Sequence, residues 1–166
     1  MADGRVAICP GTYDPVTNGH LDIIGRAARV FDRVVVGVVN QPVRKQETLF
    51  TAEERKGFID QALAANGVDN VDVVVFSNLV VELAREHGAG AIVKGLRAIS
   101  DFEYEFEMNQ LNRKLAPDIE SVYIIASPDY SFLSSTGVKE MATFGGDVSD
   151  LVPAGVAAAL VERLKR

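Results

Sequence analysis

The 166-residue sequence contains a single cysteine, Cys9, and only two histidines. One cysteine excludes an internal disulfide, which suits a reducing cytoplasm. The same scarcity leaves no Cys/His cluster for a structural metal. We therefore expect a cytoplasmic protein that is stabilised by its apolar core, with Cys9 as a small buried residue and no metal held by protein side chains.

Long apolar runs are also missing. No stretch approaches the ~20 apolar residues that a membrane-spanning helix needs, and no signal peptide is readable in residues 1–5 or in the short apolar run that follows. The formal net charge of −6 lacks the basic footprint of a nucleic-acid binder, although a local basic pocket for phosphate is compatible with it. We expect neither a membrane nor a nucleic-acid partner.

The apolar residues gather in short, β-branched runs at positions 6–9, 33–39, 71–76, 91–93 and 121–126. Continuous rather than alternating apolar character predicts strands that are buried on both faces, as in a parallel sheet. Helical patterns lie between the runs. The sequence therefore predicts a single α/β domain over residues 1–166, with a Rossmann-like, doubly wound, five-stranded parallel sheet.

Local signals predict where helices begin and where ligands bind. Residues 51–54 and 100–103 have the form of a capping box. Other helices are predicted over residues 80–87 and 135–144, and Pro153 fits the first turn of a last helix. In doubly wound sheets, ligands bind beyond the carboxyl ends of the strands, so functional residues should follow the strands.

The loop after the first run reads Pro-Gly-Thr-Tyr-Asp-Pro-Val-Thr-Asn-Gly-His, residues 10–20. It contains neither the dinucleotide fingerprint nor a P-loop. It is still a glycine-punctuated turn into a helix, with Asn18 as the expected N-cap. Backbone N–H groups and the helix dipole at that end favour an anion, and Gly19 lets a phosphate approach the backbone. The plain alternative is a structural loop with a surface histidine.

Polar residues follow other strands as well. Residues 40–45 end in a basic pair, and Lys94-Gly-Leu-Arg97 follows the fourth run. A lysine at the end of a buried strand is costly unless it is paired or faces a ligand, and an arginine offers a planar donor fork for phosphate. Taken alone, these residues could equally be salt-bridge partners, and the serines at 134 and 135 could be caps.

Together the segments resemble one superfamily. Gly11 to Pro15 followed by Thr17-Asn-Gly-His20 matches the nucleotidyltransferase pattern G-T/S-F/Y-D-P…T/H-x-G-H, and residues 133–139 match its second nucleotide motif, with Leu133 in place of the commoner Ile. The Thr-x-Gly-His form and the full match of residues 94–97 and 101–105 are similar to the phosphopantetheine adenylyltransferase family. The resemblance covers essentially the whole chain.

The resemblance implies transfer of the adenylyl group of ATP to 4′-phosphopantetheine in coenzyme A biosynthesis, giving dephospho-coenzyme A and pyrophosphate. It also implies Mg²⁺ with ATP, coenzyme A as a feedback ligand and a homohexamer. His20 would stabilise the transition state, and Thr12 and Lys94 would join it in catalysis. The implied ATP-binding residues are Thr12, Tyr13, His20, Gly95, Leu96, Arg97, Glu105, Tyr130, Ser131, Phe132, Leu133, Ser134, Ser135 and Thr136. The implied acceptor-binding residues are Thr12, Arg44, Lys45, Leu79, Val80 and Lys94.

Several assignments stay open. Counting from Pro42 aligns Arg44 with the family's basic residue, whereas requiring lysine favours Lys45. Leu79 and Val80 could bind the pantetheine arm or pack in the core, and the same holds for the helix face with Met108, Leu111 and Asn112. Asp101 is expected to cap or brace its helix, and His87 to lie at a helix end. A sister enzyme that uses CTP or nicotinamide mononucleotide, or a sensor without catalysis, is the alternative function.

Overall fold

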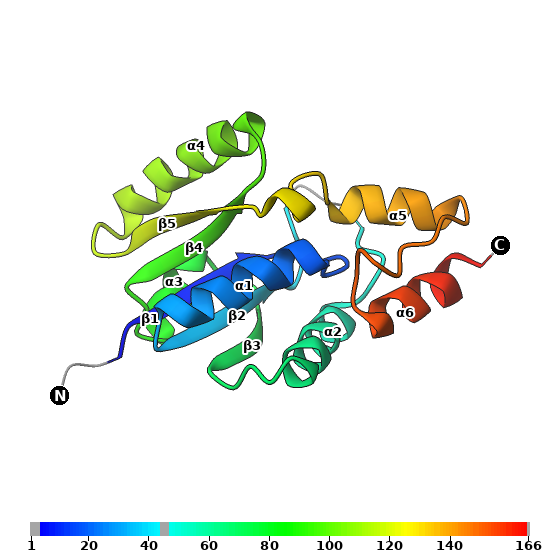
Figure 1. Cartoon of the computed structure of the whole chain (residues 1–166). Coiled ribbons are helices and arrows are strands. Elements are labelled where there is room, and N and C mark those ends of the chain that lie inside the picture. The colour runs from blue at the N-terminus through cyan, green and yellow to red at the C-terminus, as the bar shows by residue number, and fades with distance from the viewer. Residues whose placement is uncertain (1–3, 44–46, 166) are drawn as a thin grey trace.

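The structure is a computed structural model that describes residues 4–43 and 47–165. Within these residues five parallel strands form one sheet in the order β3-β2-β1-β4-β5, with helices on both faces (Figure 1). The strands are β1 (Val6–Gly11), β2 (Arg33–Val39), β3 (Val71–Phe76), β4 (Ala91–Leu96) and β5 (Glu120–Ile125). The prediction of a doubly wound, five-stranded parallel sheet is confirmed.

The helices are α1 (Asn18–Val30), α2 (Ala52–Ala65), α3 (Val80–Glu86), α4 (Ile99–Leu115), α5 (Ser135–Thr143) and α6 (Ala154–Leu164), with a short 3₁₀ helix η1 (Pro128–Tyr130). On one face of the sheet, Val36 belongs to an apolar cluster with Ile24 of α1 and Ile59 of α2. On the other face, Val35 belongs to a cluster with Leu83 of α3. Both faces are therefore buried, as continuous apolar runs predict. No helix in the described part of the chain has the length and apolar character that crossing a bilayer demands.

Two strands are longer than their apolar runs. β1 continues to Gly11, and β4 continues through Lys94 to Leu96, because these residues keep pairing with β2 and β5. Lys94, for example, lies opposite Tyr123 of β5. The prediction that Lys94, Gly95 and Leu96 follow the strand is therefore wrong by three residues, since main-chain pairing does not require apolar side chains.

The helix starts follow the predictions in part. Thr51 forms the expected capping box with Glu54, whose N–H donates to Thr51 Oγ1 at 3.2 Å. The box at residues 100–103 is wrong: α4 already begins at Ile99, and its N-cap Ala98 has no side-chain bond. Asp101 instead accepts the backbone N–H of Arg97 at 3.0 Å, so it braces the turn before the helix.

The N-cap of α1 is Thr17 rather than Asn18. The Thr17 hydroxyl accepts the N–H of His20 at 3.3 Å. Asn18 is used differently, because its N–H donates to the carbonyl of Leu151 at 2.9 Å. The chain therefore enters α1 one residue earlier than predicted and is tied there to the segment before α6.

The sheet has a switch point between β1 and β4. These strands pair only through Ala7–Ala91 and Ile8–Ile92, whereas each of the other neighbouring pairs continues through six positions. Strand order also reverses here, because β2 and β3 lie on one side and β5 on the other. The carboxyl ends of β1 and β4 are therefore the expected place for a ligand.

Candidate functional site

His20 lies in the first turn of α1, at the switch point, and its ring is held by the helix cap. The backbone N–H of Thr17 donates to His20 Nδ1 at 3.0 Å. Because a backbone N–H can only donate, Nδ1 is the unprotonated nitrogen, and the neutral ring carries its proton on Nε2. Tyr13 contacts the ring edge-on, with centroids 5.1 Å apart. His20 is thus oriented as an Nε2–H donor at a helix N-terminus, where anions are favoured.

With its side chain, Tyr13 stabilises the loop that follows β1. Its side chain is buried, its hydroxyl donates to the carbonyl of Cys9 at 2.9 Å, and its φ of 52° lies in the left-handed region. A Cβ at Gly11 would lie 2.9 Å from the Tyr13 ring, so this position requires glycine. Burial raises the pKa of Tyr13 well above its ordinary value. The Tyr13 side chain therefore has a structural role within the loop.

Lys94 and Glu105 form a partly buried ion pair. Lys94 Nζ lies 3.4 Å from Glu105 Oε1, with the side chains 29% and 14% exposed. Tyr123 donates its hydroxyl to the Glu105 carbonyl at 3.2 Å, and burial raises the pKa of Tyr123. The structure therefore brings together a residue expected at the acceptor phosphate and one expected at ATP, and it gives Lys94 the partner that its burial requires.

Arg97 joins the loops that follow β4 and β5. Its guanidinium donates to Asp101 Oδ2 at 3.2 Å and to the carbonyl of Leu133 at 2.7 Å. Gly95, one strand position beyond Lys94, packs on α1, because a Cβ there would lie 3.0 Å from Ile23. The Lys94–Arg97 segment thus lies against both α1 and the loop before α5.

The segment before α5 approaches the loop after β1. Ser134 caps α5 by accepting the N–H of Gly137 at 3.0 Å, and Ser135 donates to the carbonyl of Pro15 at 2.7 Å. The side chains of Leu133 and Leu96 are both buried. Ser131, Phe132 and Thr136 are exposed, and Tyr130 is half-buried beside Gly19.

The residues expected at the acceptor arm are only partly placed. Leu79, the N-cap of α3, is 53% exposed, whereas Val80 is half-buried. Met108 and Asn112 of α4 are half-buried, and Leu111 is exposed. Arg44 and Lys45 lie outside the described residues.

His87 is the C-cap of α3, as its position predicts, and Cys9 is buried.

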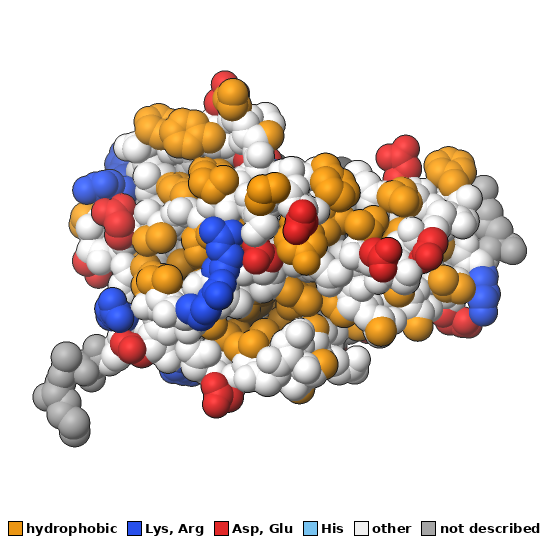
Figure 2. Space-filling view, in the orientation of Figure 1, with side chains coloured by type: hydrophobic (Ala, Val, Ile, Leu, Met, Phe, Trp, Pro, Cys, Tyr) orange, Lys and Arg blue, Asp and Glu red, His pale blue; other side chains and the backbone are white. Residues whose placement is uncertain are grey.

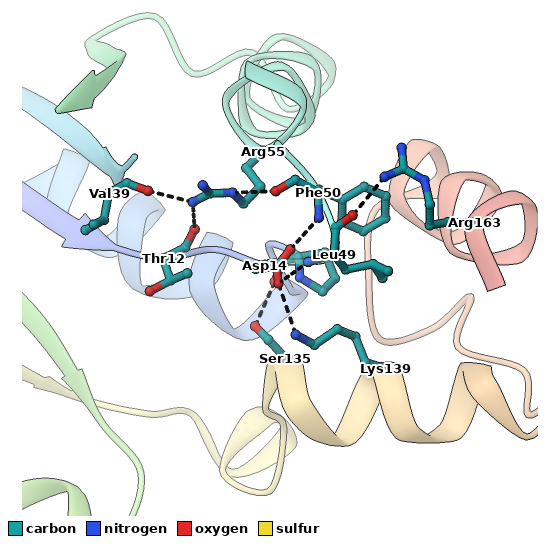
Figure 3. A network of polar contacts seen from close by, with 10 residues as sticks. Thr12, Asp14, Val39, Leu49, Phe50, Arg55, Ser135, Lys139 and Arg163 are labelled. Atoms are coloured by element: carbon teal, nitrogen blue, oxygen red, sulfur yellow. Dashed lines mark hydrogen bonds and ion pairs between the residues drawn. The ribbon is translucent and has the colours of Figure 1, made fainter. Parts of the chain in front are cut away.

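Two buried charged residues beside the candidate site are not singled out by sequence reasoning. Asp14 and Arg55 are both fully buried, on the loop after β1 and in α2 (Figure 3). Arg55 donates to the carbonyl of Thr12 at 2.7 Å, and Lys139 of α5 donates to Asp14 Oδ2 at 3.0 Å. Burial lowers the pKa of Arg55, and the nearby Asp14 carboxylate opposes that change. Thr12 itself is half-buried above this pair.

The arrangement matches a known family. Residues 8–141 fit the model of the cytidylyltransferase-like family, and the chain belongs to that family. The coarser sequence prediction, a nucleotidyltransferase family, is confirmed, and the pantetheine branch stays a prediction.

Solved structures show the same fold. A protein assigned as a nicotinate-nucleotide adenylyltransferase from Vibrio parahaemolyticus is 16% identical, with a TM-score of 0.74 over 99% of this chain and 98% of that one. A bifunctional NMN adenylyltransferase/ADP ribose pyrophosphatase from Francisella tularensis is 15% identical, with a TM-score of 0.70 over 96% of this chain and 50% of that one. At these identities the likeness extends to the fold.

Proposed function

We propose that the protein transfers the adenylyl group of ATP to 4′-phosphopantetheine, giving dephospho-coenzyme A and pyrophosphate in coenzyme A biosynthesis. The observation that supports the proposal is the position of three residues on the two strands that flank the switch point: His20 lies in the first turn of the helix after β1, Lys94 lies on β4, and Arg97 directly follows β4. The match of residues 94–97 and 101–105 to the pantetheine branch supports the choice of acceptor.

The reaction is an in-line displacement. An oxygen of the acceptor phosphate attacks the α-phosphorus of ATP, the bond from that phosphorus to the bridging oxygen breaks, and its electron pair leaves with pyrophosphate. The acceptor phosphate is already ionised, so no general base is needed. Positioning and charge neutralisation are then the protein's contributions.

Each of the proposed site residues has its own role in this reaction. His20 donates from Nε2 to the oxygens that gain charge in the transition state, and Thr12 binds the reacting phosphates beside it. Lys94 places its ammonium group on the acceptor phosphate, and Glu105 orients that lysine while it contacts ATP. The remaining ATP contacts are Tyr13, Gly95, Leu96, Arg97 and residues 130–136. Of these, Tyr13, Leu96 and Leu133 contribute backbone groups, because their side chains are buried.

Mg²⁺ is proposed as the ion that accompanies ATP, where it neutralises triphosphate charge. Residues 4–43 and 47–165 contain no group of three His, Cys, Asp or Glu side chains that could hold a metal. We propose that phosphate oxygens hold most of this ion's coordination sites.

Three further proposals concern acceptor, ligand and assembly. Leu79, which is exposed just after β3, binds the pantetheine arm with Val80, and Arg44 and Lys45 are proposed to bind the phosphate of the acceptor. Coenzyme A binds the same site as a feedback ligand, in the cytoplasm. The protein assembles as a homohexamer, which the exposed apolar residues of α4 support: Ile99, Phe102, Phe106, Leu111 and Leu115. Figure 2 shows apolar side chains in orange over this helix, among polar and charged ones.

A pyrophosphate-release assay with ATP and 4′-phosphopantetheine tests the proposed function. Turnover supports it. Binding of both compounds without release of pyrophosphate would make the protein a sensor instead.

A further inference from the structure

Leu49 and Phe50 are held by charged side chains at every backbone polar group. Asp14 accepts both N–H groups, from Leu49 at 2.9 Å and from Phe50 at 3.0 Å. Arg163 of α6 donates to the Leu49 carbonyl at 2.8 Å, and Arg55 donates to the Phe50 carbonyl at 3.1 Å (Figure 3). Turns ordinarily satisfy such groups with backbone partners or water. Four charge-assisted bonds on two residues are a stronger restraint than a turn needs.

The same guanidinium also holds other segments around the candidate site. Besides Phe50, Arg55 donates to the carbonyls of Val39 at 2.8 Å and Asn40 at 3.0 Å, where the chain leaves β2. It also donates to the carbonyl of Thr12. One side chain therefore fixes the end of β2, the start of α2 and the loop after β1 relative to one another.

This arrangement is costly. Asp14 and Arg55 have no exposed surface, and taking charges out of water costs several kcal/mol per ion before their bonds offset it. Apolar residues of similar volume often stabilise a fold as well as a buried ion pair does. Asp14 forms an ion pair with Lys139 at 3.0 Å, but its other bonds, and all of those that Arg55 donates, go to backbone atoms. Such bonds fit a role in setting backbone geometry.

We propose that Asp14 and Arg55 are positioning residues for the transfer reaction, an inference that rests on the proposed function. They do not touch substrate. They hold the backbone at Thr12, Asn40 and Leu49 in the geometry that the reacting phosphates require. A displacement of about 1 Å at a reacting group can cost ~10²-fold in rate, so small shifts here are sufficient to lower turnover.

Two conservative variants test this proposal. Asp14→Asn keeps the shape but directs an amide NH₂ donor at groups that also donate, and Arg55→Lys keeps the charge but cannot span four carbonyls. The matched controls are Asp72→Asn and Arg33→Lys, which alter an exposed ion pair of 2.7 Å at the opposite end of the strands.

The expected result is a folded protein in which kcat falls about 10²-fold and KM for ATP rises about tenfold, while the controls match the parent. Amide hydrogen exchange at Leu49 and Phe50 should be faster in Asp14→Asn. If Arg55→Lys does not fold, Arg163→Gln serves instead. The Arg163 side chain is 42% exposed, and its replacement removes one of the four bonds that hold Leu49 and Phe50. We expect kcat of this variant to fall about tenfold.

Folded Asp14→Asn and Arg163→Gln variants with kcat within about threefold of the parent would overturn the proposal. Failure of the proposed function has a different signature. If the parent releases pyrophosphate only with another phosphorylated acceptor, the same comparison is made with that acceptor. If the parent releases pyrophosphate with no acceptor, calorimetric titration with ATP tests the positioning role instead. Asp14→Asn should bind ATP about tenfold more weakly than Asp72→Asn does. Equal affinity of the two variants would refute the positioning role.

Discussion

The imidazole of His20 accepts the backbone N–H of Thr17 through Nδ1, at 3.0 Å, and so completes the capping box of α1. One side chain therefore has two roles. It satisfies a group at the start of a helix, and it presents the opposite ring nitrogen as a donor at the switch point of the sheet. The two roles predict two separable effects of its removal.

Replacement of His20 with Ala should lower kcat at least ~10²-fold, with a smaller change in KM, because the interaction is strongest in the transition state. Loss of the cap should also lower the free energy of unfolding by about 1 kcal/mol. Steady-state kinetics and denaturant unfolding measure the two effects. The control is His87→Ala, the other histidine, at the end of α3. A value of kcat within about threefold of the parent would leave His20 as a cap alone.

Single replacements of Arg44 and Lys45 with Ala should identify one phosphate contact in the basic loop, and we expect the larger rise in KM at Arg44. Removal of a charge-assisted bond to phosphate should cost about 1.5–3 kcal/mol in kcat/KM. Lys56→Ala, which breaks an exposed pair with Asp60, is the control. Small and equal effects at both positions would mean that the loop is only solvated.

Analytical ultracentrifugation should find a hexamer. Phe106→Glu on the exposed face of α4 should weaken it, because a charge would then have to be desolvated in the interface. Val30→Glu, at an exposed apolar position of α1, should leave it intact. A stable, active monomer of the parent would contradict this prediction.

The Cys9 thiol should make stability sensitive to high pH. Burial raises the pKa of this thiol to about 12, above the ordinary 9.0. Below pH 9 the thiol is protonated in both the folded and the unfolded state, so its contribution to the free energy of unfolding is fully present. That contribution is lost as pH rises toward about 12, because the unfolded state then releases the proton more readily than the folded state does. Cys9→Ala should reduce the decline in free energy of unfolding over that range. In the parent, a thiol reagent at pH 8 should react only on unfolding, and rapid reaction with the folded protein would contradict the assignment.

Much of the fold could be predicted from local pattern. β-branched runs such as residues 33–39 indicate buried strands because only a sheet covered on both faces accommodates them. The strand ends could not be predicted in this way, because Lys94 continues β4 through main-chain pairing. The N-cap at Thr17 was missed for a related reason: Asn18 is an equally good capping residue, and its use is decided by its distant bond to Leu151.

The candidate site also contains residues that a local sequence pattern predicts and residues that only the fold brings together. The motif around Thr12 and His20 could be recognised because its residues are adjacent in sequence. Arg55 gives no such signal: within Thr51-Ala-Glu-Glu-Arg55 it reads as an exposed residue of the first helical turn. Its burial depends on carbonyl groups from Val39 and Thr12, which only the fold brings together. Asp14 belongs to the recognised motif, but its role in binding Leu49 and Phe50 is evident only in the fold.

The central claim is the choice of acceptor, and it is tested most directly by pyrophosphate release from ATP across a panel of acceptors. The panel contains 4′-phosphopantetheine, nicotinate mononucleotide and nicotinamide mononucleotide, with CTP replacing ATP in a parallel series. The account predicts fast release only with ATP and 4′-phosphopantetheine, because the segments at residues 94–97 and 101–105 match that branch. Comparable release with either mononucleotide, or with CTP as the donor, would contradict it.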